Sequence, residues 1–265
     1  MERRAARLIR QQTGSDVTEH ALRRLHRAPG VRMLSLGSGP GGIELALARE
    51  AREAEITCMD FNPALVQLGQ EHALRDGLRV TFQMADLNTV VLPKASFDVV
   101  FCHASLHHTL ELERLAEQIR SALRPDGELI VVDVITRNGY LMWPETRGIV
   151  GALWKTLPAR FRMNHTAYST PHVDEEIWEA DTSQGSMECV RSQDILPVLS
   201  NIFAVRWFVP YFCICRRFFD TMYGPNYDLA EPLDLALLNW IWELDVHYLA
   251  TKRLRPETIF GIFAL

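Results

Sequence analysis

The sequence lacks any apolar run of the roughly 20 residues that a membrane-spanning helix needs. It also lacks a basic surplus, because its 28 Lys and Arg residues are outnumbered by 33 Asp and Glu residues in a chain of 265. Proteins dedicated to nucleic-acid binding usually carry an excess of positive charge. We therefore expect no integral membrane association and no nucleic-acid partner.

Cysteine is scarce, and its spacing matches no zinc site. The five residues are scattered along the chain, and no signal peptide precedes them. An odd, dispersed set of this kind predicts a reducing, cytoplasmic location without a metal site. Most of the five lie in runs that we interpret as strands, where cysteine packs as a small hydrophobic residue; the set is Cys58, Cys102, Cys189, Cys213 and Cys215.

Tryptophan and tyrosine are absent from the first 139 residues. In their place, short β-prone runs alternate with segments of helical spacing, as in a parallel sheet covered on both faces. One helix start is especially clear, because Asn62 and Pro63 form an N-cap followed by proline. Ligands of such sheets bind beyond the carboxyl ends of the strands. The predicted strands are 32–36, 55–60, 79–84, 97–102 and 128–135.

A glycine-dense turn follows the first predicted strand, in the segment LSLGSGPGG at 34–42. Gly37, Gly39 and Gly42 satisfy the G-x-G-x-x-G pattern of nucleotide-binding loops. Asp60 ends the second predicted strand, where a carboxylate can accept hydrogen bonds from two ribose hydroxyls. Asp86 follows the third, where it could accept from an adenine amine. No second phosphate-facing loop is evident, which argues against a dinucleotide.

These segments together resemble the class I S-adenosylmethionine-dependent methyltransferases from residue 31 to about 137. The matching pieces, in order, are LSLGSGPGG, CMDFNP, ADL at 85–87, FDVVFCHASLHH at 97–108 and LRPDGELIVVD at 123–133. The resemblance implies an α/β, doubly wound, seven-stranded and mostly parallel sheet, the Rossmann-like methyltransferase fold. Its last strand is antiparallel, and 204–215 and 257–264 are expected to supply strands six and seven.

The resemblance also implies S-adenosylmethionine as the cofactor. The glycine turn would contact the methionine portion and ribose, Asp60 the ribose, Asp86 the adenine amine, and the end of the fourth strand the methionine amine. For Phe61 and Leu87, packing in the core is nearly as good an interpretation as cofactor binding. The implied cofactor-binding residues are Gly37, Ser38, Gly39, Asp60, Phe61, Ala85, Asp86, Leu87, Cys102 and His103.

The chemistry of methyl transfer depends mainly on alignment, because the sulfonium already makes the methyl group electrophilic. A hydroxyl acceptor also benefits from a base, and His107 and His108 are the catalytic candidates. The alternative is that one of these histidines only packs under the cofactor. A second set, His165, Tyr168 and His172 with Asp133 or the acidic run 174–181, matches no metal-ligand pattern, so we favour a solvated acidic face.

The chain is expected to form one domain, 1–265. It divides into N-terminal helices (1–30), a cofactor-binding core (31–138), a helical or irregular cap inserted after strand five (139–189), and the remaining sheet and helices (190–265). Aromatic residues of the cap predict a substrate-binding lid, and the alternative is that they form the core of the insertion itself. The substrate-binding candidates are Tyr140, Trp143 and Tyr168.

We therefore expect methyl transfer to a small-molecule or glycan-like acceptor, with O-methylation favoured over C- or N-methylation. One alternative is a nicotinamide-dependent oxidoreductase, although no Tyr-x-x-x-Lys pair is evident. Another is a non-catalytic cofactor-binding module. The arginines of the first ten residues are interpreted as a solvated helix face. The apolar stripe of 237–250 favours either a homodimer contact or packing on the sheet.

Overall fold

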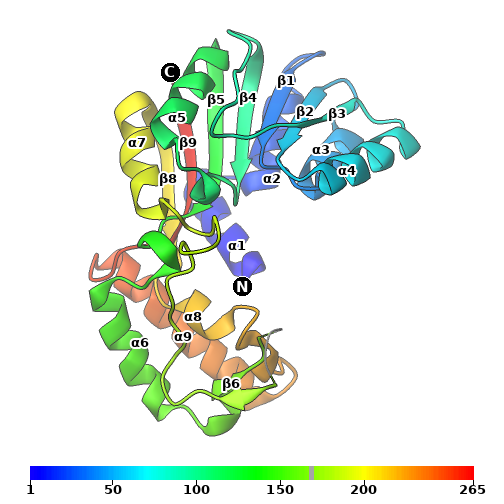
Figure 1. Ribbon diagram of the computed structural model, residues 1–265. Coiled ribbons are helices and arrows are strands. Elements are labelled where there is room, and N and C mark those ends of the chain that lie inside the picture. Colours follow the sequence, from blue (N-terminus) through cyan, green and yellow to red (C-terminus); the bar gives the residue numbers. More distant parts are fainter. Residues whose placement is uncertain (167–169) are drawn as a thin grey trace.

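The computed structural model describes residues 1–166 and 170–265, and its centre is a seven-stranded sheet of order β3-β2-β1-β4-β5-β9-β8 (Figure 1). The pairs among β1 to β5 are all parallel, whereas β9 runs antiparallel to both β5 and β8. The expected fold class and the antiparallel last strand are confirmed. The strands are β1 (Arg32–Leu36), β2 (Glu55–Asp60), β3 (Val80–Met84), β4 (Phe97–His103), β5 (Leu123–Val134), β8 (Ala204–Tyr211) and β9 (Thr258–Ala264).

One predicted strand, 204–215, is too long by four residues. β8 ends at Tyr211 because Phe212 adopts φ 57° and turns the chain. The next backbone N–H groups, at Cys213 and Cys215, donate to the buried carboxylate of Asp245. Cys213 and Cys215 therefore lie outside the sheet, and Cys215 begins helix α8 (Cys215–Phe219).

Helices cover both faces of the sheet, as the strand–helix alternation predicts. One face carries α2 (Val17–Leu25), α3 (Gly42–Glu50) and α4 (Pro63–Arg75), and the other carries α5 (Leu112–Ala122) and α7 (Ile195–Ile202). The start of α4 follows the predicted signal, because the Asn62 side chain accepts from the N–H groups of Ala64 and Leu65. Each face therefore has its own buried apolar cluster.

Helix α1 (Glu2–Thr13) buries Ala5 and Ile9 and contacts β8, so its apolar side faces inward as expected. Two of its four arginines make contacts within the protein: Arg10 pairs with Asp16 and Glu19, and Arg4 lies 5.6 Å from the ring centre of Trp242. In the described part of the chain, no helix is long and apolar enough to cross a bilayer.

A second layer faces the carboxyl ends of the strands (Figure 1). It contains α6 (Pro144–Thr156), the short hairpin β6 (Met163–Asn164) and β7 (His172–Val173), α8, and α9 (Pro232–Ala250). The buried Trp154 of α6 lies 4.7 Å from the Tyr223 ring and 6.1 Å from the Phe218 ring. We expected only 139–189 in this cap, but the segment between β8 and β9 shares its core. Short 3-10 helices occupy Leu106–His108 (η1), Asn138–Tyr140 (η2), Ala159–Arg162 (η3), Ser192–Asp194 (η4) and Gly224–Asn226 (η5).

Candidate functional site

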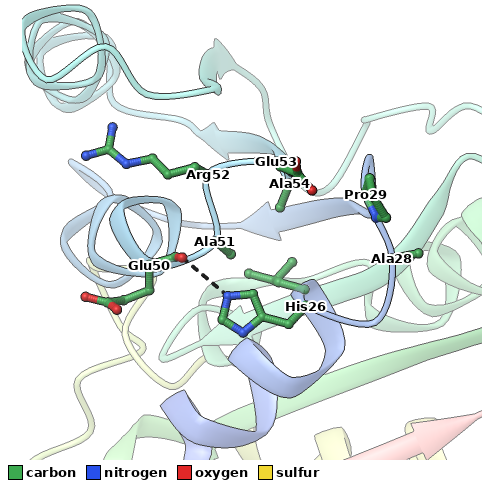
Figure 2. Close-up of a pocket in the computed structure, with 9 residues that line it drawn as sticks. His26, Ala28, Pro29, Glu50, Ala51, Arg52, Glu53 and Ala54 are labelled. Atoms are coloured by element: carbon green, nitrogen blue, oxygen red, sulfur yellow. Dashed lines mark hydrogen bonds between the residues drawn. The ribbon is translucent and has the colours of Figure 1, made fainter.

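Two of the cavities formed by the described residues lie at opposite ends of the strands. The smaller, of about 270 Å³, lies where the chain enters β1 and β2. Its lining includes Arg52 and Glu50, whose carbonyl His26 contacts at 3.3 Å (Figure 2). The larger, of about 950 Å³, lies at the carboxyl ends of the strands, between α1 and the cap. Because parallel α/β sheets bind ligands beyond the carboxyl ends of their strands, the larger cavity is the candidate site.

The glycine loop is folded tightly against the neighbouring strands. Gly37 has φ 70°, and a Cβ atom at this position would lie 2.4 Å from the Cβ of Ser105. The backbone N–H groups of Gly37 and Ser38 both donate to the carbonyl of Met59, at 2.8 and 3.1 Å. Glycine is therefore required at position 37 both for its backbone conformation and for space.

Asp60 lies beside this loop, as the resemblance implies. One of its carboxylate oxygens accepts from Gly39 N at 2.7 Å, and the other accepts from Asn62 N at 2.9 Å. A carboxylate has about four acceptor positions, so both oxygens can still accept from ribose hydroxyls. Phe61 next to it is 72% exposed, which argues against core packing for this residue.

The remaining cofactor candidates lie along the same strand tips. Ala85 N donates to the Asp60 carbonyl at 2.9 Å, and the Asp86 carboxylate accepts from Asn88. Leu87 packs against the apolar cluster of one sheet face, so the packing interpretation holds for it. Cys102 is fully buried in β4, and burial raises the pKa of its thiol. Only His103 among these candidates lines the larger cavity.

His107 is buried at the end of β4 and fixed by Asp133 from the end of β5. Its Nδ1 lies 2.6 Å from Asp133 Oδ1, while Asp133 Oδ2 accepts from the N–H groups of Ser105 and Leu106. Burial lowers the pKa of His107, but the hydrogen bond and charge of Asp133 and the charge of Glu188 outweigh it, so the pKa lies above its ordinary value. The second ring nitrogen, Nε2, faces Glu188.

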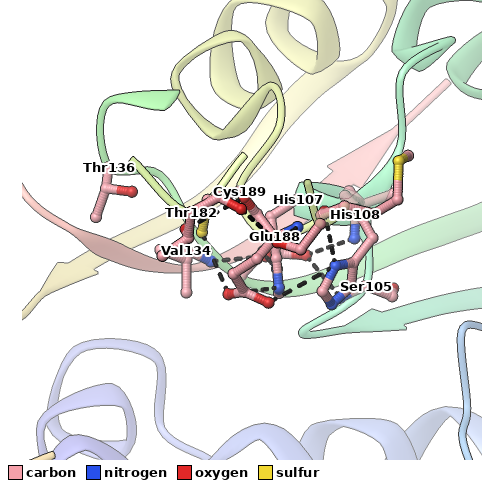
Figure 3. A network of polar contacts seen from close by, with 12 residues as sticks. Ser105, His107, His108, Val134, Thr136, Thr182, Glu188 and Cys189 are labelled. Atoms are coloured by element: carbon pink, nitrogen blue, oxygen red, sulfur yellow. Dashed lines mark hydrogen bonds and ion pairs between the residues drawn. The ribbon is translucent and has the colours of Figure 1, made fainter. Parts of the chain in front are cut away.

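Glu188 brings the cap segment into contact with both candidate histidines (Figure 3). Its carboxylate lies 3.6 Å from His107 Nε2 and 3.8 Å from His108 Nδ1. The backbone supports this contact, because Val190 N donates to the His107 carbonyl at 3.0 Å. Glu188 also lines the larger cavity, so the cluster reaches the cavity wall through this residue.

The predicted substrate-binding residues have different locations. Tyr140 lines the cavity together with Trp178. Trp143 is not among the described residues that line it; instead its ring lies 3.7 Å from the Arg255 guanidinium. Tyr168 lies outside the described residues. Trp154 is in the core of the cap, as the alternative interpretation of these aromatics expected.

The second histidine set does not come together with Asp133. His165 Nε2 lies 2.7 Å from Asn226 Oδ1, and His172 Nε2 lies 3.1 Å from Asp174 Oδ1. These contacts belong to the cap hairpin and its neighbours.

The sequence did not point to several residues of the cavity wall. Arg216 lies on α8, Asp220 directly follows that helix, and Glu2 comes from α1. Arg216 has no carboxylate within ion-pair distance among the described residues, and its guanidinium lies 5.3 Å from the Tyr140 ring centre. None of these residues, nor Glu188, belongs to a motif, because contacts between distant segments leave no local pattern.

Comparison with known proteins supports the cofactor assignment. Residues 33–127 match the family described as a methyltransferase domain. A ubiquinone biosynthesis O-methyltransferase from Xanthomonas axonopodis pv. citri is 31% identical over 114 residues, or 43% of this chain and 46% of that protein. The chain spans less than half the length of the curated relatives it matches.

Solved structures show the same fold. An S-adenosylmethionine-dependent methyltransferase from Mesorhizobium loti has a TM-score of 0.52 at 17% identity, over 93% of this chain and 97% of that one. A geranyl diphosphate C-methyltransferase from Streptomyces coelicolor A3(2) has a TM-score of 0.54 at 10% identity, over 93% and 74%. Residues 33–127 therefore match a methyltransferase domain, and the chain as a whole has a fold found in S-adenosylmethionine-dependent methyltransferases.

Proposed function

We propose that the protein transfers the methyl group of S-adenosylmethionine to a hydroxyl of a polar small molecule or glycan-like acceptor. The observation that carries this proposal is the position of the large cavity. It begins at His103, beside the proposed methionine end of the cofactor, and extends to the cap. An acceptor bound there meets the methyl group away from the adenine and ribose contacts of Asp86 and Asp60.

The wall of the cavity favours a polar acceptor. Charged groups of both signs line it, among them Arg216, Asp133 and Glu188, and such groups form hydrogen bonds with hydroxyls. The flat faces of Tyr140 and Trp178 suit the C–H face of a sugar ring. Of the three predicted residues, Tyr140 belongs to this pair, whereas Trp143 contacts Arg255 instead.

O-methylation also agrees with the position of the two candidate histidines. A hydroxyl must lose its proton during transfer, and His107 and His108 both lie close to Glu188, which lines the cavity. We propose that this cluster handles the proton of the acceptor. Both an O- and a C-methyltransferase occur among the similar proteins. The support for methylation of an oxygen atom therefore comes from the side chains in and beside the cavity wall.

The test is ligand-dependent thermal stability followed by an acceptor screen. S-adenosylmethionine and S-adenosylhomocysteine should each raise the melting temperature, because a ligand that binds only the folded state stabilises it. NAD should leave it unchanged. Equal shifts with NAD would favour the oxidoreductase alternative. Binding without methyl transfer to any hydroxylated acceptor would favour the non-catalytic module.

Two further assignments are proposals. The five cysteines are all free and buried, which supports a reducing, cytoplasmic location. Helix α9 buries Leu238 and Ile241 but leaves Leu233 and Trp240 64% and 47% exposed, so a homodimer through this helix is proposed as well. Sedimentation of the wild type and of Trp240→Glu tests the dimer, which the substitution should dissociate.

A further inference from the structure

We propose that His107, His108 and Glu188 form a binding site for a divalent transition-metal ion such as Zn²⁺. The three side chains each offer one ligand atom, and these atoms all lie within 4.8 Å of one another. The three side chains can bind an ion whether or not the protein transfers methyl groups. The role that we give to the ion rests on the proposed function.

The donor set fits the chemistry of zinc. Two imidazoles and one carboxylate are the ligands of known catalytic zinc sites, which leave a fourth position open. Tetrahedral ligands about 2.0–2.1 Å from the ion lie roughly 3.3 Å from each other. His107 Nε2 lies 3.6 Å from Glu188 Oε1 and His108 Nδ1 lies 3.8 Å from Glu188 Oε2, and the three ligand atoms lie within 4.8 Å of one another. Around a bound ion they would therefore have to approach one another by up to about 1.5 Å.

Asp133 provides the outer-shell partner that such a site requires. A metal-binding histidine almost always donates its other ring N–H to a carboxylate or carbonyl, which fixes the tautomer and the ring orientation. The 2.6 Å contact of His107 Nδ1 with Asp133 has this arrangement and leaves Nε2 facing Glu188. The buried Asp133 is itself held by the N–H groups of Ser105 and Leu106.

The backbone holds the two ligand-bearing segments together without a metal. Val190 N donates to the His107 carbonyl at 3.0 Å, and Gly139 N donates to the Cys189 carbonyl at 2.8 Å. One contact must change, because His108 Nδ1 lies 2.9 Å from the Met187 carbonyl. His108 is 45% exposed at its side chain, so the ring has room to turn toward the ion.

The cluster adjoins the cavity, since Glu188 is part of the cavity wall. A hydroxyl bound to a divalent ion loses its proton at a lower pH. The oxygen then bonds to the methyl carbon as the carbon–sulfur bond breaks, S-adenosylhomocysteine leaves with the electron pair on sulfur, and the proton passes to water. In this refinement His107 and His108 act as ligands rather than as the base.

Cobalt titration of the chelator-treated full chain tests the site. We expect one Co²⁺ per chain, with the visible absorption of a four- or five-coordinate ion that Zn²⁺ displaces. His108→Asn and Glu188→Gln should each weaken binding by at least the roughly 10- to 100-fold that follows loss of an outer-shell partner. His247→Asn and Glu243→Gln, exposed positions on α9, are the matched controls and should bind like the wild type.

The proposal fails if the wild type binds no Co²⁺, or if the two site variants bind it as tightly as the controls. Circular dichroism and S-adenosylmethionine binding are measured on the same samples, and both should be unchanged in the site variants. If the wild type does not bind S-adenosylmethionine, the proposed function is overturned, but the Co²⁺ titration still tests the metal site. Normal cofactor binding without Co²⁺ would overturn only the metal site.

Discussion

The Nδ1 atom of His107 lies 2.6 Å from Oδ1 of Asp133, and both side chains are buried. The same carboxylate accepts from the N–H groups of Ser105, Leu106 and Val134. Asp133 therefore builds the loop after β4 and orients the ring of His107 at once. A single carboxylate at the end of β5 thus contacts both the loop after β4 and the His107 ring.

Replacing this carboxylate should be costly. Asp133→Ala leaves buried N–H groups without an acceptor and should lower the free energy of unfolding by about 3–5 kcal/mol. Asp133→Asn retains one acceptor oxygen and should lose less. Urea unfolding measures both. Asp126→Ala, at an exposed position of the same strand, should change stability by no more than about 0.5 kcal/mol, and an equal loss there would contradict the assigned role.

Asp60→Ala should weaken the binding of S-adenosylmethionine. Loss of hydrogen bonds from ribose to a charged acceptor costs about 1–3 kcal/mol, which corresponds to a Kd up to roughly 100-fold higher. Isothermal titration calorimetry measures the change. Asp76→Ala is the control, because Asp76 pairs with Arg49 and Arg75 near the end of α4. Unchanged affinity in Asp60→Ala would remove Asp60 from the cofactor site.

Gly37→Ala should destabilise the protein more than Gly14→Ala. Both glycines have positive φ, 70° and 79°, so each substitution carries a backbone cost of about 1–2 kcal/mol. Only at Gly37 would the new Cβ meet a neighbour, Ser105 Cβ at 2.4 Å, which adds about 1–3 kcal/mol of overpacking. Urea unfolding of the two variants measures the difference. Equal losses would show that the loop relaxes away from Ser105.

The ion pair of Glu113 and Arg191 should contribute stability that depends on pH. The hydrogen bond from Arg191 lowers the pKa of Glu113 to about 2. A carboxyl with a depressed folded-state pKa stabilises the protein above its unfolded pKa of about 4.3, and this contribution is lost as pH falls toward 2. Because Glu113 is 59% exposed, solvent screening limits the contribution to about 1 kcal/mol or less.

Glu113→Gln tests this pair in urea unfolding at several pH values. The variant should be less stable than the wild type at pH 7, and the gap should narrow as pH falls below about 4.5. A gap that stays constant with pH would mean that the contact acts through packing rather than through charge. High salt should also reduce the gap at pH 7.

The sequence predicted the cofactor half of the protein closely, because its signals are local. The strands at 32–36 and 55–60 agree with β1 and β2, and Asn62 caps α4 as expected. The prediction fails at 204–215, where the apolar run continues past the end of the strand. Phe212 to Cys215 are buried although they lie outside the strand. Hydrophobicity alone therefore could not show that the strand ends before them, where the backbone turns to the Asp245 carboxylate on α9.

The amino-acid sequence by itself determined the order of strands and helices, the glycine turn and the acidic residues at the strand tips, since each depends on residues within a few positions of one another. Only the tertiary structure decided which groups form the larger cavity. Glu188 reaches His107 and His108, Arg216 comes to the wall, and Trp143 turns away to Arg255. These contacts join segments far apart in the chain, and their geometry is set by the packing of the cap, which no local periodicity encodes.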